Sequence, residues 1–161
     1  MKECGEPSLP VLGAQHLAQV GIVVHDVEAA ARHYAALLGQ PVPEIGETLP
    51  GNEIAMTYRG APSNARARLA FFQLGPVQLE LIQPVGEDSA WAEGLQSAGE
   101  GVHHIAFWTD DMCAEKAVLE EHGAPMIHRA DMGEGQYAYF DAREGFGTTI
   151  ELLEGKRTNL G

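Results

Sequence analysis

Hydrophobic residues follow two different periods along the chain, and the change of period marks a strand followed by a helix. In residues 19–24, every second position carries a branched aliphatic side chain, as expected for a strand, whose successive side chains point to opposite faces. The apolar positions that follow recur at helical spacing. Asp26 is a suitable N-cap for this helix and Gly39 a suitable end. The sequence therefore predicts a strand and then a helix up to Gly39.

The same order of elements occurs a second time. Residues 104–123 again begin with a polar residue and an apolar strand-like run, and then pass an acidic step at Asp111 into a helix that stops at Gly123. A hydrophobic–Glu–Leu core also recurs, within residues 77–84 (VQLELIQP) and within residues 148–155 (TTIELLEG). These matches indicate an internal duplication.

The two repeats predict an α+β fold. Further strands are expected at residues 53–58, 67–74, near 125–129 and at 136–141, so that each half reads strand, helix and three strands, a βαβββ module. Each module is too small for a good core of its own, and the two are expected to pack together and close one sheet. The predicted division is an N-terminal tail at 1–16, a first module at 17–84, a connecting helix at 85–101, a second module at 102–155 and a C-terminal tail at 156–161.

Four polar side chains are predicted on the sheet face opposite the helices. Strand alternation places Gln19, Glu80, His104 and Glu151 on that face, and the duplication pairs Gln19 with His104 and Glu80 with Glu151. A single such Glu is usually solvent-facing, and a single such His usually hydrogen-bonded in a core. Two matched carboxylates flanked by aliphatic residues, however, are costly to desolvate without a cation. This donor set suits one divalent metal ion, such as zinc, manganese, cobalt, nickel or iron.

The other histidines are expected to be of less importance. His103 is adjacent to His104, so alternation sends it to the opposite face as a packed residue or one that supports a ligand. His16 precedes the first strand by three residues and is the spare ligand if that strand starts elsewhere. Surface positions are expected for His25, His33, His122 and His128.

Composition and charge narrow the partners. The chain has 161 residues, a net charge of −13 and 10 Lys and Arg residues against 23 Asp and Glu residues. Such a balance argues against nucleic acid, because phosphate binding needs clustered basic residues. The apolar runs are too short to cross a bilayer, and the first residues contain no apolar signal region. We therefore expect a cytoplasmic protein with a small-molecule substrate.

The loop RGAPSNARAR is the densest basic segment of the chain. It carries Arg59, Arg66 and Arg68, which could clamp a carboxylate or phosphate at the mouth of the cup. The alternative is an ordinary solvated loop. Two acids precede it in a Gly- and Pro-containing stretch, Glu47 and Glu53.

Taken together, these stretches resemble the vicinal oxygen chelate superfamily, which includes glyoxalases, methylmalonyl-CoA epimerases, extradiol dioxygenases and bleomycin-resistance proteins. The resemblance covers about residues 17–154 and is carried by AQVGIVVHDVEAAARHYAALLG, VQLELIQP, GVHHIAFWTDD and TTIELLE. It implies paired βαβββ modules that form a cupped mixed sheet around a metal. Its ligands, on the first and last strands of each module, map onto Gln19, Glu80, His104 and Glu151.

The ligand identities point to different branches of this superfamily. A set of Gln, Glu, His and Glu resembles the zinc glyoxalases, whereas extradiol dioxygenases have His where this chain has Gln19. The stretches LIQPVGED and GVHHIAFWTDD resemble methylmalonyl-CoA epimerases, although epimerases more usually carry His first and Gln second. Taken over all these stretches, the sequence resembles the epimerases most.

The resemblance implies a metal-dependent epimerase or isomerase, expected to act as a homodimer, that abstracts a proton next to a carbonyl of an acyl-CoA or a 2-oxo or hydroxy acid. By similarity to the glyoxalases, Glu151 would be the base, and Glu47 or Glu53 would be the epimerase-like alternatives. A glyoxalase-type lactoylglutathione lyase is the second reading. The third is a non-catalytic antibiotic-binding protein, a class that typically lacks the metal ligands.

Overall fold

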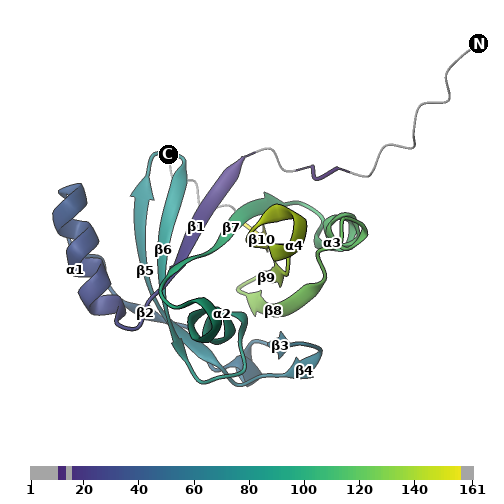
Figure 1. Cartoon of the computed structure of the whole chain (residues 1–161), viewed down its shortest axis with the longest axis horizontal. Coiled ribbons are helices and arrows are strands. Elements are labelled where there is room, and N and C mark those ends of the chain that lie inside the picture. The colour runs from purple at the N-terminus through teal and green to yellow at the C-terminus, as the bar shows by residue number, and fades with distance from the viewer. Residues whose placement is uncertain (1–10, 14–15, 157–161) are drawn as a thin grey trace, which may run out of the picture.

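The computed structural model describes residues 11–13 and 16–156, which form one curled mixed sheet with helices packed on it (Figure 1). The strands are β1 (Leu17–Val23), β2 (Gly46–Glu47), β3 (Thr57–Tyr58), β4 (Ala61–Pro62), β5 (Arg66–Leu74), β6 (Val77–Val85), β7 (Gly101–Thr109), β8 (Met126–Met132), β9 (Gly135–Phe140) and β10 (Thr149–Glu154). The helices are α1 (Val27–Leu38), α2 (Ala90–Ala98), α3 (Met112–Glu121) and α4 (Arg143–Phe146), with a 3-10 turn, η1 (Gly51–Glu53).

The sheet has an internal symmetry that follows the sequence repeat. Its strand order is β2-β5-β6-β1-β7-β10-β9-β8-β3-β4. In the first half β1 runs parallel to β6, and in the second β7 runs parallel to β10. The antiparallel pair of β1 and β7 joins the halves within one chain. The expected α+β fold of two βαβββ modules in a cupped sheet is therefore confirmed.

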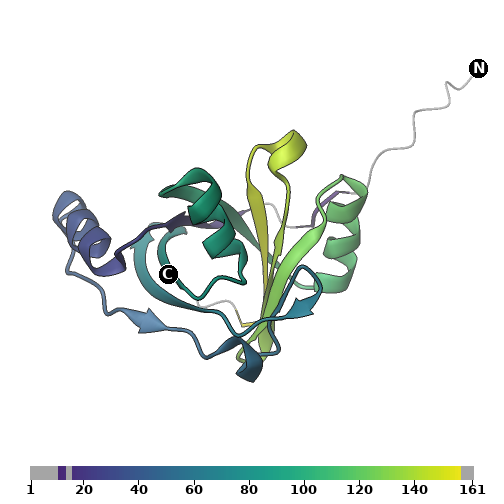
Figure 2. The ribbon, with the colours of Figure 1, turned by 60° about the horizontal axis from the view of Figure 1, so that its bottom comes forward.

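The helices cover the outside of the cup and close one end of it. α1 packs on the outer face of the first half through Val27 and Ala31, and α3 packs on the second half through Leu119. α2, which lies between the two halves in Figure 2, contacts β6, β1 and β7 and sends Trp91 into an inner hydrophobic cluster. The outer face of the sheet therefore packs against α1 and α3. The inner face lines the cup and packs against α2.

The helix ends follow the local sequence. The side chain of Asp26 accepts a hydrogen bond from Ala29 N, and that of Asp111 accepts one from Ala114 N, each at 3.0 Å. These are the N-caps that the sequence predicts. Gly39 has a φ of 64° at the end of α1, a conformation that glycine adopts without steric cost.

The prediction of a strand at residues 53–58 is wrong. Glu53 ends the 3-10 turn η1, and only Thr57 and Tyr58 form a strand. The backbone has positive φ at Ala55 (48°) and at Arg59 (49°), which interrupts an extended chain. Met56 is instead buried in the inner cluster. The β3–β4 hairpin then pairs with β8 of the second half, and the two-residue β2 is the edge strand of the first.

The other expected strands lie within three residues of their predicted bounds, and α2 falls inside the predicted connecting segment 85–101. The division of the chain into tails and modules at the stated residues stays a prediction. None of the helices in the described part of the chain is both long and apolar enough to cross a membrane. The cytoplasmic location stays a prediction.

Candidate metal centre

The four predicted metal ligands come from four adjacent strands of the sheet. They lie on β6, β1, β7 and β10 in that spatial order. Leu81 and Leu152 pack outward against the helices, so strand alternation turns their neighbours Glu80 and Glu151 into the cup. The outer apolar positions therefore fix which way the acidic side chains point.

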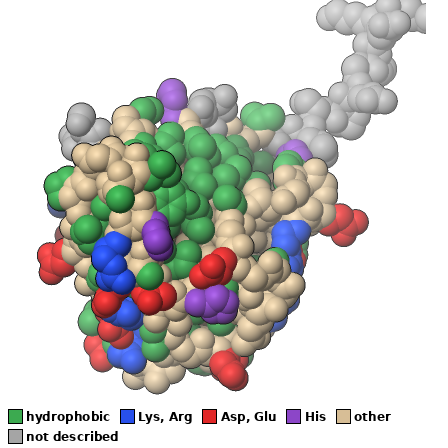
Figure 3. Space-filling view, turned by 60° about the vertical axis from the view of Figure 1, so that its left-hand side comes forward, with side chains coloured by type: hydrophobic (Ala, Val, Ile, Leu, Met, Phe, Trp, Pro, Cys, Tyr) green, Lys and Arg blue, Asp and Glu red, His purple; other side chains and the backbone are tan. Residues whose placement is uncertain are grey.

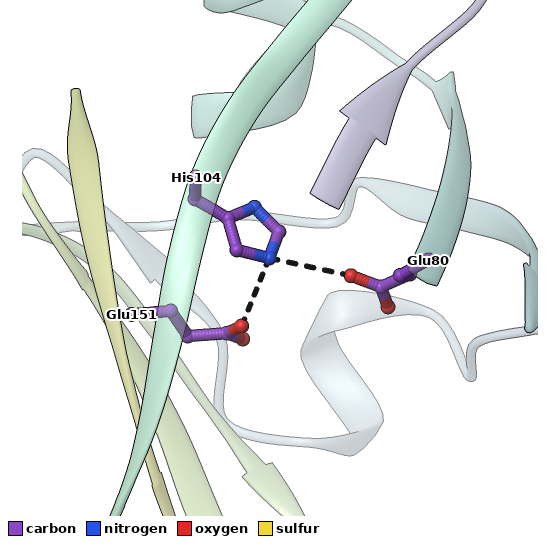
Figure 4. Close-up of side chains that lie close together, drawn as sticks. All are labelled: Glu80, His104 and Glu151. Atoms are coloured by element: carbon purple, nitrogen blue, oxygen red, sulfur yellow. Dashed lines mark ion pairs between the residues drawn. The ribbon is translucent and has the colours of Figure 1, made fainter. Parts of the chain in front are cut away.

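The polar ends of these side chains meet around the ring of His104 (Figure 4). The Nε2 atom of His104 lies 3.0 Å from Oε2 of Glu151 and 3.4 Å from Oε2 of Glu80. The same atom lies 3.3 Å from Oε1 of Gln19. All four residues are buried, and His104 has an exposed fraction of 0%. Glu80, His104 and Glu151 each offer an atom within 4.8 Å of the others.

The amide of Gln19 completes the ring of acceptors. Its inward-facing atom, the oxygen in the present orientation, lies 3.0 Å from Oε2 of Glu151 and 3.2 Å from Oε2 of Glu80. Its Nε2 atom donates to Oε1 of Gln78 at 2.8 Å. These three oxygens surround Nε2 of His104, and a rotated Gln19 amide would donate to both carboxylates. With its oxygen facing inward, the amide would instead add a third oxygen donor for a cation.

Gly21 makes room for the imidazole. A Cβ atom at this position of β1 would lie 2.0 Å from Cε1 of His104, much closer than atoms can approach. Gly21 pairs directly with His104 across β1 and β7. A glycine within a strand commonly marks a close approach of this kind.

The electrostatics of the site also favour a bound cation. Burial, reinforced by the charge of Glu151, raises the pKa of Glu80 above its usual value. Burial by itself lowers the pKa of His104, but Glu151 and Glu80 outweigh it and raise that pKa to about 9. Two buried carboxylates beside one imidazole hold a surplus of negative charge, which is costly in a low-dielectric interior. One imidazole nitrogen, one amide oxygen and two carboxylates fit a single divalent metal ion.

A cavity of about 640 Å³ is lined by three of the four ligands, Gln19, Glu80 and Glu151. Its wall is mostly apolar and aromatic, and includes Leu69, Phe71, Trp91, Trp108, Tyr137 and Leu153. The phenol of Tyr139 lies beside the site and accepts a hydrogen bond from Trp91 Nε1 at 2.9 Å. The cavity is therefore suited to a compact substrate whose polar end reaches the ligands and whose remainder is apolar.

The other acids named as base candidates do not line this cavity. Glu47 is exposed on β2 and pairs with Arg66 at 2.8 Å. Glu53 is exposed at the end of η1. The cavity is lined instead by residues next to them in the sequence, Thr48 and Ile54. The position of these two acids gives no support to a role as the base, whereas Glu151 lines the cavity.

The three arginines also lie outside the cavity lining and are paired with acids. Arg59 contacts Glu93 at 2.6 Å, Arg66 contacts Glu47, and Arg68 contacts Glu28 at 2.5 Å. On the face shown in Figure 3, basic side chains lie beside acidic ones, below a patch of hydrophobic side chains. This geometry gives no support to the predicted clamp.

The homodimer also stays a prediction, although an exposed hydrophobic patch is a common feature of contact surfaces.

Two histidines differ from their predicted places. His128 is 1% exposed rather than on the surface, because β8 turns it toward Trp91 and Tyr137. His103 is packed, as expected, but it does not point away from His104, and both rings contact Tyr139. Burial, helped by the neighbouring His104, lowers the pKa of His103 to about 4. The exposed His25 and His33 are as predicted, and His16 is exposed just before β1.

The aromatic wall of the cavity was not predicted from the sequence. Tyr137 and Tyr139 alternate on β9, and Tyr139 is the register partner of Glu151. This alternation was available as a signal, because residues two apart on a strand share a face. Trp91 could not be placed in this way, because its position depends on how α2 closes the cup.

Comparison with known proteins shows the family to which this chain belongs. Residues 18–140 match the Glyoxalase/Bleomycin resistance protein/Dioxygenase superfamily. The uncharacterized protein YqjC of Bacillus subtilis is 29% identical over 143 residues, which are 87% of this chain and 92% of YqjC. The ethylmalonyl-CoA/methylmalonyl-CoA epimerase of Cereibacter sphaeroides is 31% identical over 112 residues, 69% of this chain and 73% of that protein.

A solved structure of a methylmalonyl-CoA epimerase is also similar to this chain. A variant of Streptomyces coelicolor methylmalonyl-CoA epimerase in complex with 2-nitronate-propionyl-CoA is similar with a TM-score of 0.63 and 25% identity, over 90% of this chain and 100% of the other. The chain belongs to the Glyoxalase/Bleomycin resistance protein/Dioxygenase superfamily, as its sequence resemblance implied. Its relatives include methylmalonyl-CoA epimerases.

Proposed function

We propose that the protein is a metal-dependent epimerase or isomerase, which removes and returns a proton on a carbon next to a carbonyl. The observation that carries this proposal is the convergence of Gln19, Glu80 and Glu151, which line an apolar cavity, on the buried His104. These four side chains would hold one divalent ion, of which zinc, cobalt, nickel and manganese fit the donor set. When bound, the ion supplies positive charge that stabilises the negative charge developing on the substrate oxygens.

One of the two carboxylates of the site is suited to move the proton. Glu80 and Glu151 both contact Nε2 of His104, one from each half of the sheet (Figure 4). We assign Glu151, which lines the cavity, as the base that removes and returns the proton. Glu80 would remain a ligand of the ion in its deprotonated form.

The residues that line the cavity indicate which part of a substrate can enter it. Among the described residues that line it, Lys156 is the one cation, and its Nζ lies 3.4 Å from Oε2 of Glu134. The relatives named as epimerases act on CoA thioesters, which supports an acyl thioester as substrate. The lining supports a small apolar acyl group inside the cavity, with the phosphates of such a thioester remaining outside. A free 2-oxo or hydroxy acid of similar size is the other substrate in this class.

A deuterium-exchange experiment tests the proposal. Protein stripped with a chelator and reloaded separately with zinc, cobalt, nickel or manganese is incubated in D₂O with a panel of acyl-CoA thioesters and 2-oxo and hydroxy acids. We expect exchange at the carbon next to the carbonyl only in metal-loaded protein. Glu151→Gln should abolish exchange with metal still bound, whereas Glu47→Gln and Glu53→Gln should retain it. The proposal fails if the protein binds no metal, or if no compound in the panel exchanges.

One observation favours a second function. The ligand set of Gln, Glu, His and Glu resembles that of zinc glyoxalases rather than the set more usual in epimerases. The same reloaded samples should therefore be assayed with the hemithioacetal of methylglyoxal and glutathione. Thioester formation there, without exchange in the panel, would assign the protein as a glyoxalase-type lyase. An antibiotic-binding protein would instead bind its ligand equally well without metal.

A further inference from the structure

His103 occupies a bulge in β7 directly before the ligand His104. In the pairing of β7 with β1, His104 is opposite Gly21 and Val102 is opposite Ile22, so that His103 has no partner. A bulge of this kind breaks the alternation of side chains. As a result, Nδ1 of His103 lies 3.0 Å from Nδ1 of His104. The two rings are in contact on the same side of the strand.

Hydrogen bonding determines which nitrogens of the two rings carry protons. The Nε2 atom of His103 lies 2.9 Å from the carbonyl oxygen of Ala90. A carbonyl only accepts, so His103 Nε2 must donate, and the Nδ1 atom of a neutral His103 is then an acceptor. The close Nδ1 pair requires His104 Nδ1 to be the donor. A neutral His104 therefore presents a bare Nε2 to the carboxylates, which is the form that binds a metal.

We propose that His103 is a positioning residue that fixes the tautomer and ring orientation of His104, and so links the first turn of α2 to the metal centre. Ligating histidines usually donate their second N–H to a carboxylate, a carbonyl or water. Here a second histidine takes that place and passes the hydrogen bond on to a backbone carbonyl. The inference rests on the proposed metal centre, but not on the identity of the substrate.

The backbone group at the end of this chain of hydrogen bonds is held firmly. Ala90 is the first residue of α2, and its N–H donates to Nδ1 of the buried His128 at 3.2 Å. Its carbonyl accepts from His103. Ser89 caps the helix by accepting from Ala92 N at 3.1 Å. The peptide groups on both sides of Ala90 are thus fixed by two strands of the second half.

Gly94 provides an independent observation that α2 is shaped around His103. A Cβ atom at Gly94 would lie 2.6 Å from Cδ2 and 3.2 Å from Nε2 of the His103 ring. Glycine is less favourable than alanine inside a helix. The helix therefore carries an unfavourable residue at the one turn where the ring of His103 requires space.

Metal affinity, measured by competition with a chromophoric chelator for Zn²⁺, tests the inference. His103→Phe keeps the size of the ring and removes the acceptor, and it should weaken zinc binding by about 10–100-fold. His103→Asn retains an acceptor oxygen near the position of Nδ1 and should recover part of that loss. Gly94→Ala should also weaken binding, because the methyl group displaces the ring. Gln96→Ala, on the exposed side of the same helix, is the control and should bind as the wild type does.

The tautomers provide a readout that does not depend on any variant. In zinc-loaded, ¹⁵N-labelled wild-type protein, NMR should show protons on Nδ1 of His104 and on Nε2 of His103. The inference is overturned if His104 is protonated on Nε2, or if His103→Phe and Gly94→Ala bind zinc as tightly as the wild type. A wild-type protein that binds no zinc, cobalt, nickel or manganese would overturn the metal centre itself. The two failures are therefore distinguishable.

Discussion

The two halves of the sheet each contribute two ligands, but they support the matched pair Gln19 and His104 in different ways. In the first half, the amide of Gln19 is held by Gln78, its register partner on the neighbouring strand β6. In the second half, His104 is held by His103 and, through it, by Ala90 of α2. A duplicated strand position has thus kept its place at the site while its donor and the support behind it have diverged. We expect the second half to determine metal affinity and the first half to adjust it.

The largest effect should follow from removing the imidazole. His104→Ala leaves Glu80 and Glu151 buried together without the group that separates them, and it removes the one nitrogen donor of the set. Zinc affinity should fall by more than the ~100-fold typical of supporting residues. Chelator competition measures the loss, with circular dichroism to verify folding. Wild-type affinity in His104→Ala would show that the metal lies elsewhere.

The pH dependence should separate the two halves further, because an amide does not titrate and an imidazole does. The pKa of His104 in the metal-free protein is raised to about 9, so below that pH a metal must displace a proton. Apparent zinc affinity should rise about tenfold per pH unit toward pH 9 and then level off. Titration calorimetry in buffers of different ionisation enthalpy should show the released proton. Affinity that is flat between pH 6 and 9 would contradict this assignment.

A smaller effect is expected in the first half. Gln19→Ala removes a neutral amide donor whose place water can take, so zinc affinity should fall by about tenfold, less than the loss in His104→Ala. Gln19→His would instead give the first half the donor that the second half already has, and should bind at least as tightly as the wild type. Equal losses in Gln19→Ala and His104→Ala would show that the halves contribute alike.

The smallest effect is expected at the exposed arginines. Arg66→Gln breaks its pair with Glu47, in which both side chains are more than 40% exposed. Exposed pairs contribute less than about 1 kcal/mol to stability, and Arg66 does not line the cavity. The free energy of unfolding in urea should therefore change by less than about 1 kcal/mol. The KM for the substrate found by deuterium exchange should remain within about twofold of wild type. A large rise in KM would instead show that Arg66 binds substrate, as the loop sequence suggested.

Much of the fold was predictable from the sequence, because the duplication supplied each pattern twice. Strand alternation around Leu81 and Leu152 was sufficient to turn Glu80 and Glu151 into the cup. Alternation fails where the strand is irregular. The bulge at His103 depends on pairing with β1, which no local pattern reveals.

Long-range packing accounts for the other differences. Residues 53–58 have a strand-like composition, yet burial of Met56 and positive φ at Ala55 determine their conformation. The basic loop appeared to be a substrate clamp because its acidic partners are distant in sequence: Arg59 pairs with Glu93, and Arg68 with Glu28. Such partners become visible only when the sheet is assembled.

A crystal structure of the zinc-loaded protein, with anomalous data collected at the zinc edge, addresses the metal centre most directly. We expect a single anomalous peak in each chain, bound by Nε2 of His104 and by oxygens of Gln19, Glu80 and Glu151 at about 2.0–2.2 Å. A peak outside this set of side chains, or zinc-soaked crystals with no peak at all, would contradict the account.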